Sequence, residues 1–176
     1  MAHHCYWLLG GTMNAPLFVG YNSAAYRLLH CGMKGLRKSR ALPTVGDAPT
    51  AKRALEAREA LGLPSDSRVD VCVTCDRDKR KGTLLRSRKC PWAEERDYLS
   101  FGNDIYVASP ELAFLQSAET LTVSELAFLG LEMCGAHVSR DGEFDRNRPL
   151  TCREALVEYI SRHAGVRGSW QGKGSA

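Results

Sequence analysis

The sequence predicts an α+β domain with an N-terminal helix, a small and mostly antiparallel sheet that includes a basic hairpin, and three C-terminal helices. Residues 68–75, RVDVCVTC, alternate valine with more polar residues, which is the two-residue period of a half-buried strand. The last third of the chain instead carries three helix-start signatures, at residues 109–111, 122–125 and 151–154. Strand signals followed by a run of helix signals are typical of the α+β class.

Two helices are expected before the sheet. The first lies in NSAAYRLLHCG, with Asn22 or Ser23 as its cap and Gly32 at its end. The second is AKRALEAREAL, which ends at Gly62. Residues 33–50 are basic and then rich in glycine and proline, which predicts a loop between the two helices.

The sheet is expected to consist of two hairpins. The strand of residues 68–75 leads into a Lys81–Gly82 turn, and TLLRSRKC returns beside it as the second strand of a basic hairpin until Pro91 stops it. DYLSFG and IYVAS form the other hairpin around Gly102–Asn103, a dipeptide typical of tight β-turns.

The C-terminal helices have the clearest local signals. Residues 109–111, SPE, combine a cap, a proline at the first helical position and an acid in the first turn. TVSE at 122–125 and TCRE at 151–154 have the spacing of capping boxes. The helix after the first box, LAFLGLEMCG, is apolar almost all round, so we expect it at the centre of the core. A polar loop, RDGEFDRNRP, precedes the last helix, which runs to His163.

The length of 176 residues fits one domain, which we place at residues 19–164. Residues 1–18 are interpreted as an N-terminal extension, with either Met1 or Met13 as the true start. Residues 165–176 are interpreted as a flexible tail or a truncated linker.

No stretch approaches the roughly 18 apolar residues of a membrane span, so no membrane partner is expected. The apolar patch near the N-terminus has no lysine or arginine before it, unlike a secretory signal. The seven cysteines are an odd number and widely scattered, which favours reduced thiols in a cytoplasmic protein.

A CxxC pair, Cys72 and Cys75, suggests a zinc knuckle or a redox pair. A structural zinc site needs a second pair of ligands at similar spacing. The sequence has no second CxxC pair, because Cys90, Cys134 and Cys152 are single cysteines, and His137 and His163 lie far apart. A redox pair is usually placed at a helix N-terminus, whereas this pair follows a strand. We therefore predict no metal and no cofactor, and interpret most cysteines as small apolar side chains.

The sequence lacks the spacings of several hydrolytic sites. It contains no G-x-S-x-G, no H-E-x-x-H and no phosphate-binding P-loop. A nuclease of the restriction-enzyme type needs an acid two residues before a lysine, and none of the seven lysines has one. We predict a protein that is not an enzyme.

The positive charge is concentrated in two clusters. Residues 77–89 hold seven basic residues and one acid, a net charge of +6, while the whole chain carries only +4. Such clusters predict an anionic partner, and a two-stranded basic ribbon fits the phosphates and major groove of DNA. The other interpretation is a solvated loop that keeps the protein soluble. The candidate nucleic-acid-binding residues of the two clusters are Lys34, Arg37, Lys38, Arg40, Arg77, Lys79, Arg80, Lys81, Arg86, Arg88 and Lys89.

Several segments resemble the effector half of AbiEi-type abortive-infection antitoxins. YNSAAYRLLHCG resembles the small-residue helix that opens this unit, and IYVASPELAFLQSAE resembles its later helix cap, in which Ser109, Pro110 and Glu111 would have a capping role. ELAFLGLEMCG is most similar to actinobacterial proteins in which the unit precedes a very-short-patch-repair-like (Vsr-like) nuclease domain. The resemblance covers residues 19–168.

The chain departs from both relatives at its ends. AbiEi antitoxins usually begin with a DNA-binding winged helix, for which there is no room before Tyr21. The nuclease relatives continue beyond a linker like residues 165–169, which only seven residues follow here. The resemblance thus implies an isolated middle unit: a regulatory, antitoxin-like module in phage defence that binds nucleic acid or a protein such as a toxin. The alternative is a catalytically silent accessory domain of a Vsr-like endonuclease.

Overall fold

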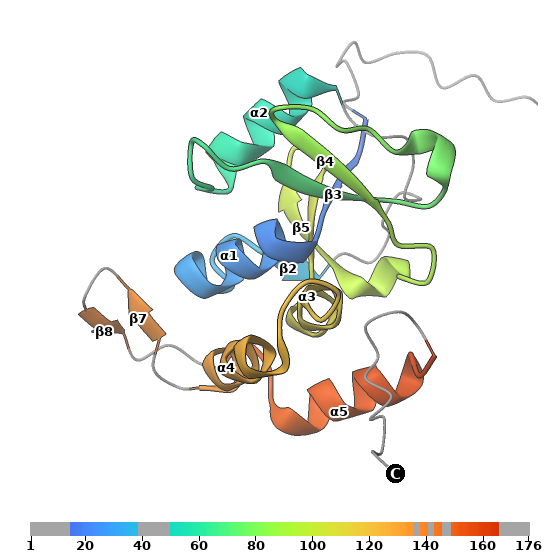
Figure 1. Ribbon diagram of the computed structural model, residues 1–176. Helices are drawn as coiled ribbons and strands as arrows, with labels where there is room; N and C mark the ends of the chain where they lie inside the picture. The colour runs from blue at the N-terminus through green and yellow to red at the C-terminus, as the bar shows by residue number, and fades with distance from the viewer. Residues whose placement is uncertain (1–14, 39–49, 136–137, 141–142, 146–148, 166–176) are drawn as a thin grey trace, which may run out of the picture.

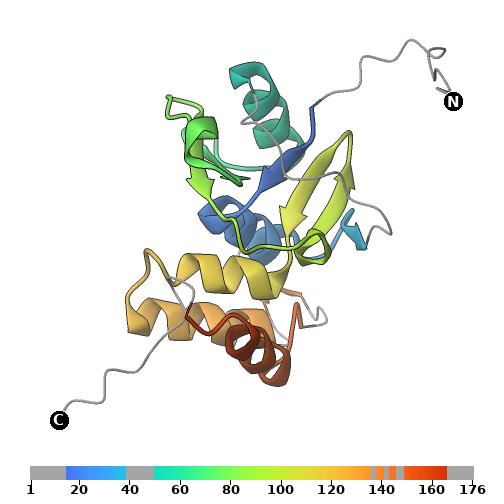
Figure 2. The same ribbon diagram turned by 90° about the vertical axis from the view of Figure 1, so that its right-hand side faces the viewer.

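The computed structural model shows a mixed six-stranded sheet with helices on both faces (Figure 1). Helices α1 and α3 cover one face, α2 lies on the other, and α4 and α5 pack beyond α3 as an outer layer (Figure 2). The predicted α+β class is therefore confirmed. The structure describes residues 15–38, 50–135, 138–140, 143–145 and 149–165. Arg40, most of the predicted extension and nearly all of the predicted tail lie outside these residues.

The strands run in the order β2-β5-β6-β1-β3-β4. Their bounds are β1 (Leu17–Val19), β2 (Arg37–Lys38), β3 (Val69–Val73), β4 (Leu85–Lys89), β5 (Tyr98–Gly102) and β6 (Ile105–Ala108). The short strand β1 lies in the middle of the sheet, parallel to β6 and antiparallel to β3. It begins two residues before the expected domain boundary at residue 19, and three residues are too few to show a strand period in the sequence.

The predicted basic hairpin is wrong, because β3 and β4 are parallel. Their register pairs Val69 with Leu85 and Val73 with Lys89. Residues 74–84 between them are long enough to carry the chain back to the starting end of β3, so β4 runs in the same direction. A turn at Lys81–Gly82 alone would have reversed it. The second predicted hairpin is confirmed: β5 and β6 are antiparallel around Asn103 and Asp104, both with left-handed backbones.

The predicted helices are present, and several of their caps are as expected. The bounds are α1 (Tyr21–Cys31), α2 (Ala51–Ala60), α3 (Pro110–Ser117), α4 (Val123–Cys134) and α5 (Arg153–Arg162). Ser109 caps α3, and Thr122 and Glu125 form the predicted capping box of α4. The box predicted at 151–154 does not form. Thr151 instead donates a 2.5 Å hydrogen bond to Glu111, and Cys152 takes the cap position of α5.

Two further features differ from expectation. Helix α1 begins at Tyr21 with Gly20 in the N-cap position and without a side-chain cap, so neither Asn22 nor Ser23 has the predicted capping role. After α4, β7 (Val138–Arg140) pairs with β8 (Glu143–Asp145) as a separate two-stranded sheet, which overlaps the polar loop predicted at residues 140–149.

The two faces of β3 meet different helices. All five of its residues are buried. Cys72 faces α3, where it accepts a hydrogen bond from Gln116, and Asp70 shares that face because it is two residues away. The alternating valines therefore point to the opposite face, which α2 covers. The polar residue within an apolar strand is thus directed toward α1 and α3.

Helix α4 is not the central helix that its composition suggested. It packs on α3 through Leu129 and Met133, and these are its only buried residues. Val123, Phe128 and Leu131 are between 60% and 69% exposed. The central position belongs to α3, which contacts α1, α4, α5 and the sheet. Since α4 is an outer helix, only one of its apolar sides can be covered by the domain.

Candidate nucleic-acid interface

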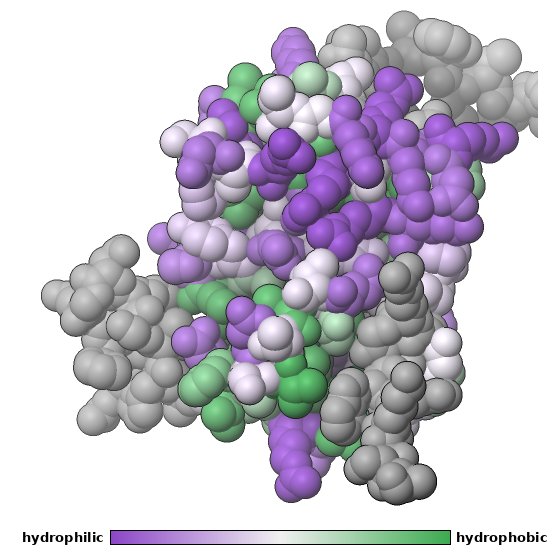
Figure 3. Space-filling view, in the orientation of Figure 1, coloured by the Kyte–Doolittle hydropathy of each residue, from purple (hydrophilic) through white to green (hydrophobic). Residues whose placement is uncertain are grey.

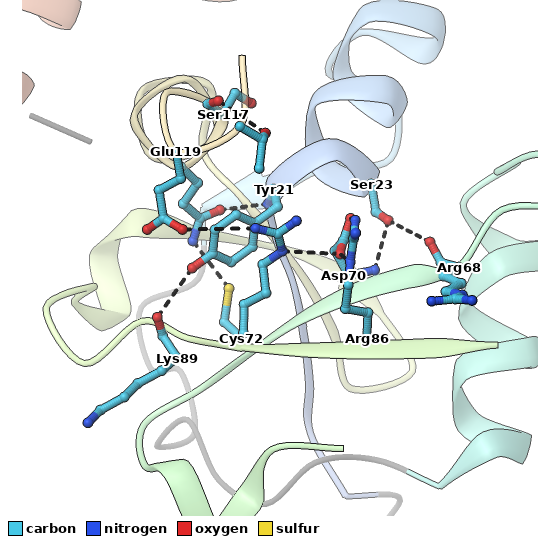
Figure 4. Close-up of polar contacts among 12 residues, drawn as sticks. Tyr21, Ser23, Arg68, Asp70, Cys72, Arg86, Lys89, Ser117 and Glu119 are labelled. Carbon is cyan, nitrogen blue, oxygen red and sulfur yellow. Dashed lines mark hydrogen bonds and ion pairs between the residues drawn. The ribbon is translucent and has the colours of Figure 1, made fainter. Parts of the chain in front are cut away.

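The carboxylate of Asp70 lies beside Arg86 of the edge strand β4 (Figure 4). Arg88 of the same strand is also close to it. Only 2% of the Asp70 side chain is exposed. Nε of Arg86 donates to Oδ1 at 2.5 Å, and Nη2 donates to Oδ2 at 2.9 Å. These hydrogen bonds raise the pKa of Arg86 above its usual value. This geometry follows from the parallel pairing of β3 and β4, because its register places Arg86 directly beside Asp70.

Arg88 is held by three groups on the same face. Its Nε lies 3.5 Å from Oδ1 of Asp70, and its Nη1 lies 3.9 Å from Glu119 at the end of α3. Its Cζ lies 4.7 Å from the centroid of the Tyr21 ring, within cation–π distance. Arg86 and Arg88 were predicted to contact phosphate. In the structure their guanidinium groups join β4 to β3, to α1 and to the turn after α3.

The start of α1 adds a second set of contacts below β4. Tyr21 has a left-handed backbone, with φ of 52°, although it is not a glycine. Its N–H donates to Oε1 of Gln116 at 2.7 Å, and its hydroxyl donates to the carbonyl of Lys89 at 3.2 Å. Nε2 of Gln116 donates to the sulfurs of Cys72 and Cys90, each at 3.2 Å. Tyr21 and Gln116 therefore join α1, α3 and the ends of β3 and β4.

Ser23 completes the junction between α1 and β3. Its hydroxyl donates to the carbonyl of Arg68 at 3.2 Å and accepts from the N–H of Asp70 at 2.9 Å. Arg68 itself is exposed and lines a cavity of about 360 Å³ together with Arg86 and Tyr26. An exposed cation thus continues the surface beyond Arg86.

The connection between β3 and β4 lies against the outer edge of β4. The N–H of Ser87 donates to the carbonyl of Arg80 at 2.9 Å, and the N–H of Arg80 donates to the Ser87 hydroxyl at 3.0 Å. The N–H of Gly82 donates to the carbonyl of Leu85 at 2.8 Å. These bonds hold the backbone of Arg80 and Lys81 in place while both residues stay exposed. Neither side chain makes an ion pair with another described residue.

Two acids, Asp76 and Asp78, offset part of the positive charge in the connection between β3 and β4. Asp76 pairs with Nζ of Lys79 at 2.6 Å and with Nζ of Lys89 at 2.9 Å. These hydrogen bonds lower the pKa of Asp76 to about 2. Arg77 lies 3.7 Å from Asp78 but keeps 87% of its side chain exposed. We name residues 76–82 the basic loop; its most available cations are Arg77, Arg80 and Lys81.

The second basic cluster lies at the other end of the sheet. Lys34 follows α1, and Arg37 and Lys38 form β2, which is the edge strand opposite β4. Five strand spacings separate the two edges, a distance of roughly 24 Å. All three residues are exposed. The two clusters therefore do not share one surface, although both were included in the predicted site.

Hydrophilic residues dominate the sheet half of the molecule in the view of Figure 3, where Figure 1 places β3, β4 and α2. No helix of the described residues is long and apolar enough to cross a membrane.

The cysteines of the CxxC pair have separate environments. Cys72 is buried beside Cys90 and Gln116, whereas the half-buried Cys75 lies beyond the strand end, in contact with Asp78. The hydrogen bond with Cys72 and burial raise the pKa of Cys90, so this thiol is protonated near neutral pH. Within the described ranges, no three His, Cys, Asp or Glu side chains gather as metal ligands would.

Sequence reasoning located the basic residues but missed the groups that position them. Asp70 could be recognised in the sequence as a charged residue in a strand of valines. Its partners, Arg86 and Arg88, could not, because they lie beside it only when β3 and β4 are parallel. Tyr21 and Gln116 gave no signal, because their contacts join residues 95 positions apart. Asp76 lies one residue outside the window in which the charge was counted.

Comparisons of this chain with family models, with curated proteins and with solved structures gave no match.

Proposed function

We propose that this protein is a non-enzymatic module that binds nucleic acid through the basic loop and the adjoining edge of β4. One observation carries the proposal. Arg80 and Lys81 are exposed, and their backbone is hydrogen-bonded to β4 at Ser87 and Leu85. Cations on a backbone that is already ordered lose less conformational entropy on binding phosphate than cations on a disordered tail.

Neighbouring arginines extend this positively charged surface at both ends. Arg77 extends it at one end, and Arg68 extends it beyond Arg86 at the other. Contacts of lysine and arginine with phosphates supply affinity without reading the base sequence. We therefore propose a contact with the backbone of duplex DNA or RNA that depends on charge and shape.

The resemblance to AbiEi-type antitoxins suggests the biological setting of the proposal. A module of this kind would act as a regulator in a phage-defence system, with nucleic-acid binding as its biochemical activity. This role rests on the resemblance and on the charge of the basic loop together.

The test is a titration of fluorescently labelled duplex DNA with the full chain, at several salt concentrations between about 50 and 200 mM. The double variant Arg80→Ala/Lys81→Ala removes two of the three most available cations, the two whose backbone is hydrogen-bonded to β4. If both contact phosphates, the slope of log affinity against log salt becomes shallower by about 2. The matched control is Lys34→Ala/Lys38→Ala, which removes the same charge at the opposite edge of the sheet.

The expected result is weaker and less salt-dependent binding for the loop variant and unchanged binding for the control. Lack of binding by the wild-type protein at low salt would overturn the proposal. So would an equal loss in both variants, because net charge alone would then explain the binding.

A further inference from the structure

The outer side of α4 is an apolar stripe that nothing in the described structure covers. Val123 is 60% exposed, and Phe128 and Leu131 are each 69% exposed. At 100° per residue, these side chains and Ala127 fall on one side of the helix, opposite Leu129 and Met133. We name Val123, Ala127, Phe128 and Leu131 the α4 face.

The exposed apolar area is large for so few residues. The four side chains together present on the order of 400 Å², which is within the range of the largest apolar patches on monomeric proteins. Figure 3 shows hydrophobic residues reaching the surface in the helical half of the molecule, where Figure 1 places α3 and α4. An apolar patch of this size marks an interaction site more often than a single exposed leucine does.

The charged residues of α4 itself, Glu125 and Glu132, are both acidic. Glu125 and Glu132 lie next to Phe128 on the helix surface, at i−3 and i+4. Hydrogen bonds from Thr122 lower the pKa of Glu125, so its carboxylate is ionised at neutral pH. From residue 97 to residue 135 the sequence contains six acids and neither lysine nor arginine.

We propose that the α4 face binds an amphipathic helix of a partner protein, one whose apolar stripe is bordered by lysine or arginine. A helix laid along α4 covers residues spaced at i, i+4 and i+8, such as Val123, Ala127 and Leu131. Basic side chains beside its stripe pair with Glu125 and Glu132 at the rim, which favours this partner over neutral or acidic ones.

The same charges argue against a second copy of this chain on the α4 face. Two α4 helices packed face to face and antiparallel would bring their glutamates together on one rim, and like charges at an interface are repulsive. The area that two copies bury there, on the order of 800 Å² in total, is also less than the roughly 1,200 Å² of a stable interface. A partner helix with lysine or arginine beside its stripe makes the same apolar contact without repulsion between glutamates.

This surface is separate from the basic loop. The sheet and α3 lie between β4 and the outer side of α4 (Figures 1 and 2). The module can therefore hold a protein partner and nucleic acid at the same time, and the two contacts can be tested independently.

The experiment measures the binding of two labelled, synthetic 18-residue helical peptides to the full chain by fluorescence anisotropy. Both peptides have the same leucine and alanine stripe, bordered by lysine in one and by glutamate in the other. The protein variants are Phe128→Ser/Leu131→Ser, the single change Leu131→Gln, and Glu132→Lys. Val157→Ser is the matched control, because Val157 is an exposed apolar residue of α5 (53%). Circular dichroism checks that each variant is folded.

We expect the lysine peptide to bind with micromolar affinity and the glutamate peptide at least tenfold more weakly. The double variant should weaken the binding of the lysine peptide at least tenfold, while Leu131→Gln and Glu132→Lys should each weaken this binding severalfold. Val157→Ser should leave it unchanged, and all variants should bind DNA as the wild-type protein does.

Three results would overturn the proposal. The first is that the lysine peptide does not bind the wild-type protein, and the second is that it binds no more tightly than the glutamate peptide. The third is that it binds the folded Leu131→Gln and double variants as tightly as the wild-type protein. Sedimentation supplies a fourth: a wild-type dimer that these same variants dissociate would assign the α4 face to a second copy.

Discussion

Arg86 and Asp70 lie side by side on β4 and β3 and form two hydrogen bonds, of 2.5 and 2.9 Å. The carboxylate is almost completely buried, whereas the guanidinium group is about one-third exposed. Arg86, one of the predicted nucleic-acid-binding residues, thus also makes a structural contact that positions the edge of the sheet. The binding surface that we propose lies beside it, on the loop that this edge strand supports.

Loss of the Arg86 side chain should be costly because it leaves a buried carboxylate. We expect Arg86→Met to lower the free energy of unfolding by about 2–3 kcal/mol, somewhat less than the loss of a fully buried partner, since Arg88 remains nearby. The double variant Asp70→Asn/Arg86→Met should be less destabilised than the sum of the two single variants. Urea unfolding followed by circular dichroism measures both quantities. Simple additivity would show that the two side chains are not coupled.

Gly20 is predicted to tolerate no side chain. A Cβ atom at this position would lie 2.5 Å from the sulfur of Cys72 and 2.6 Å from Oε1 of Gln116. Gln116 binds the N–H of Tyr21, so its displacement would also disturb the start of α1. We expect Gly20→Ala to destabilise the domain by about 1–3 kcal/mol in thermal or urea unfolding. Gly82→Ala, with open space around its Cβ, is the control and should have little effect.

Asp76 should weaken nucleic-acid binding, because it pairs with Lys79 and Lys89. In the DNA titration, Asp76→Asn is expected to bind severalfold more tightly at low salt and to show a steeper salt dependence. Glu158→Gln changes the net charge equally but lies on α5, where it affects the pair with Arg162. An equal gain in this control would assign the effect to net charge rather than to the basic loop.

The acid titration of Asp76 tests the same ion pairs. Its pKa is about 2 in the folded protein, below the usual value of 3.8 for an aspartate. The pairs therefore stabilise the loop fully above about pH 4, and this contribution is lost as the pH falls through the folded pKa. We expect the side-chain carboxyl resonance of Asp76 to titrate near pH 2 in carbon-detected NMR. In Lys79→Ala/Lys89→Ala, the midpoint should rise toward 3.8, and an unchanged midpoint would contradict the pairing.

The two sides of α4 should respond differently to truncation. Met133 is completely buried, so Met133→Ala is expected to cost about 2–4 kcal/mol of unfolding free energy. Leu131 is mostly exposed, and Leu131→Ala should change the stability by less than about 0.5 kcal/mol. Chemical denaturation of the two variants under the same conditions gives the comparison. Equal losses would mean that the α4 face is covered within the chain.

Local patterns predicted much of the secondary structure. The caps at Ser109 and Thr122 and the turn at Asn103 depend on residues within about four positions of one another, so they could be recognised in the sequence. The capping box expected at Thr151 does not form because Thr151 makes a contact with a distant part of the chain. Its hydroxyl bonds to Glu111 on α3 instead of capping its own helix.

The candidate site was predictable only in part. Residue counting identified Arg80, Lys81 and their basic neighbours. It could not show that Arg86 and Arg88 are held by Asp70, or that Lys34, Arg37 and Lys38 lie at the opposite edge of the sheet. Both facts depend on strand order and direction, which contacts between distant segments decide.

The sequence by itself determined the class of the domain, most helix positions and the presence of a concentrated positive charge, because helix caps, turns and hydrophobic periods act over a few neighbouring residues. Tertiary structure alone decided that β1 is a central strand, that β3 and β4 are parallel, and that one apolar side of α4 is exposed. The physical reason is the same in each case. A strand or helix buries its apolar side against whichever distant segment is available, and its own residues do not say which segment that is.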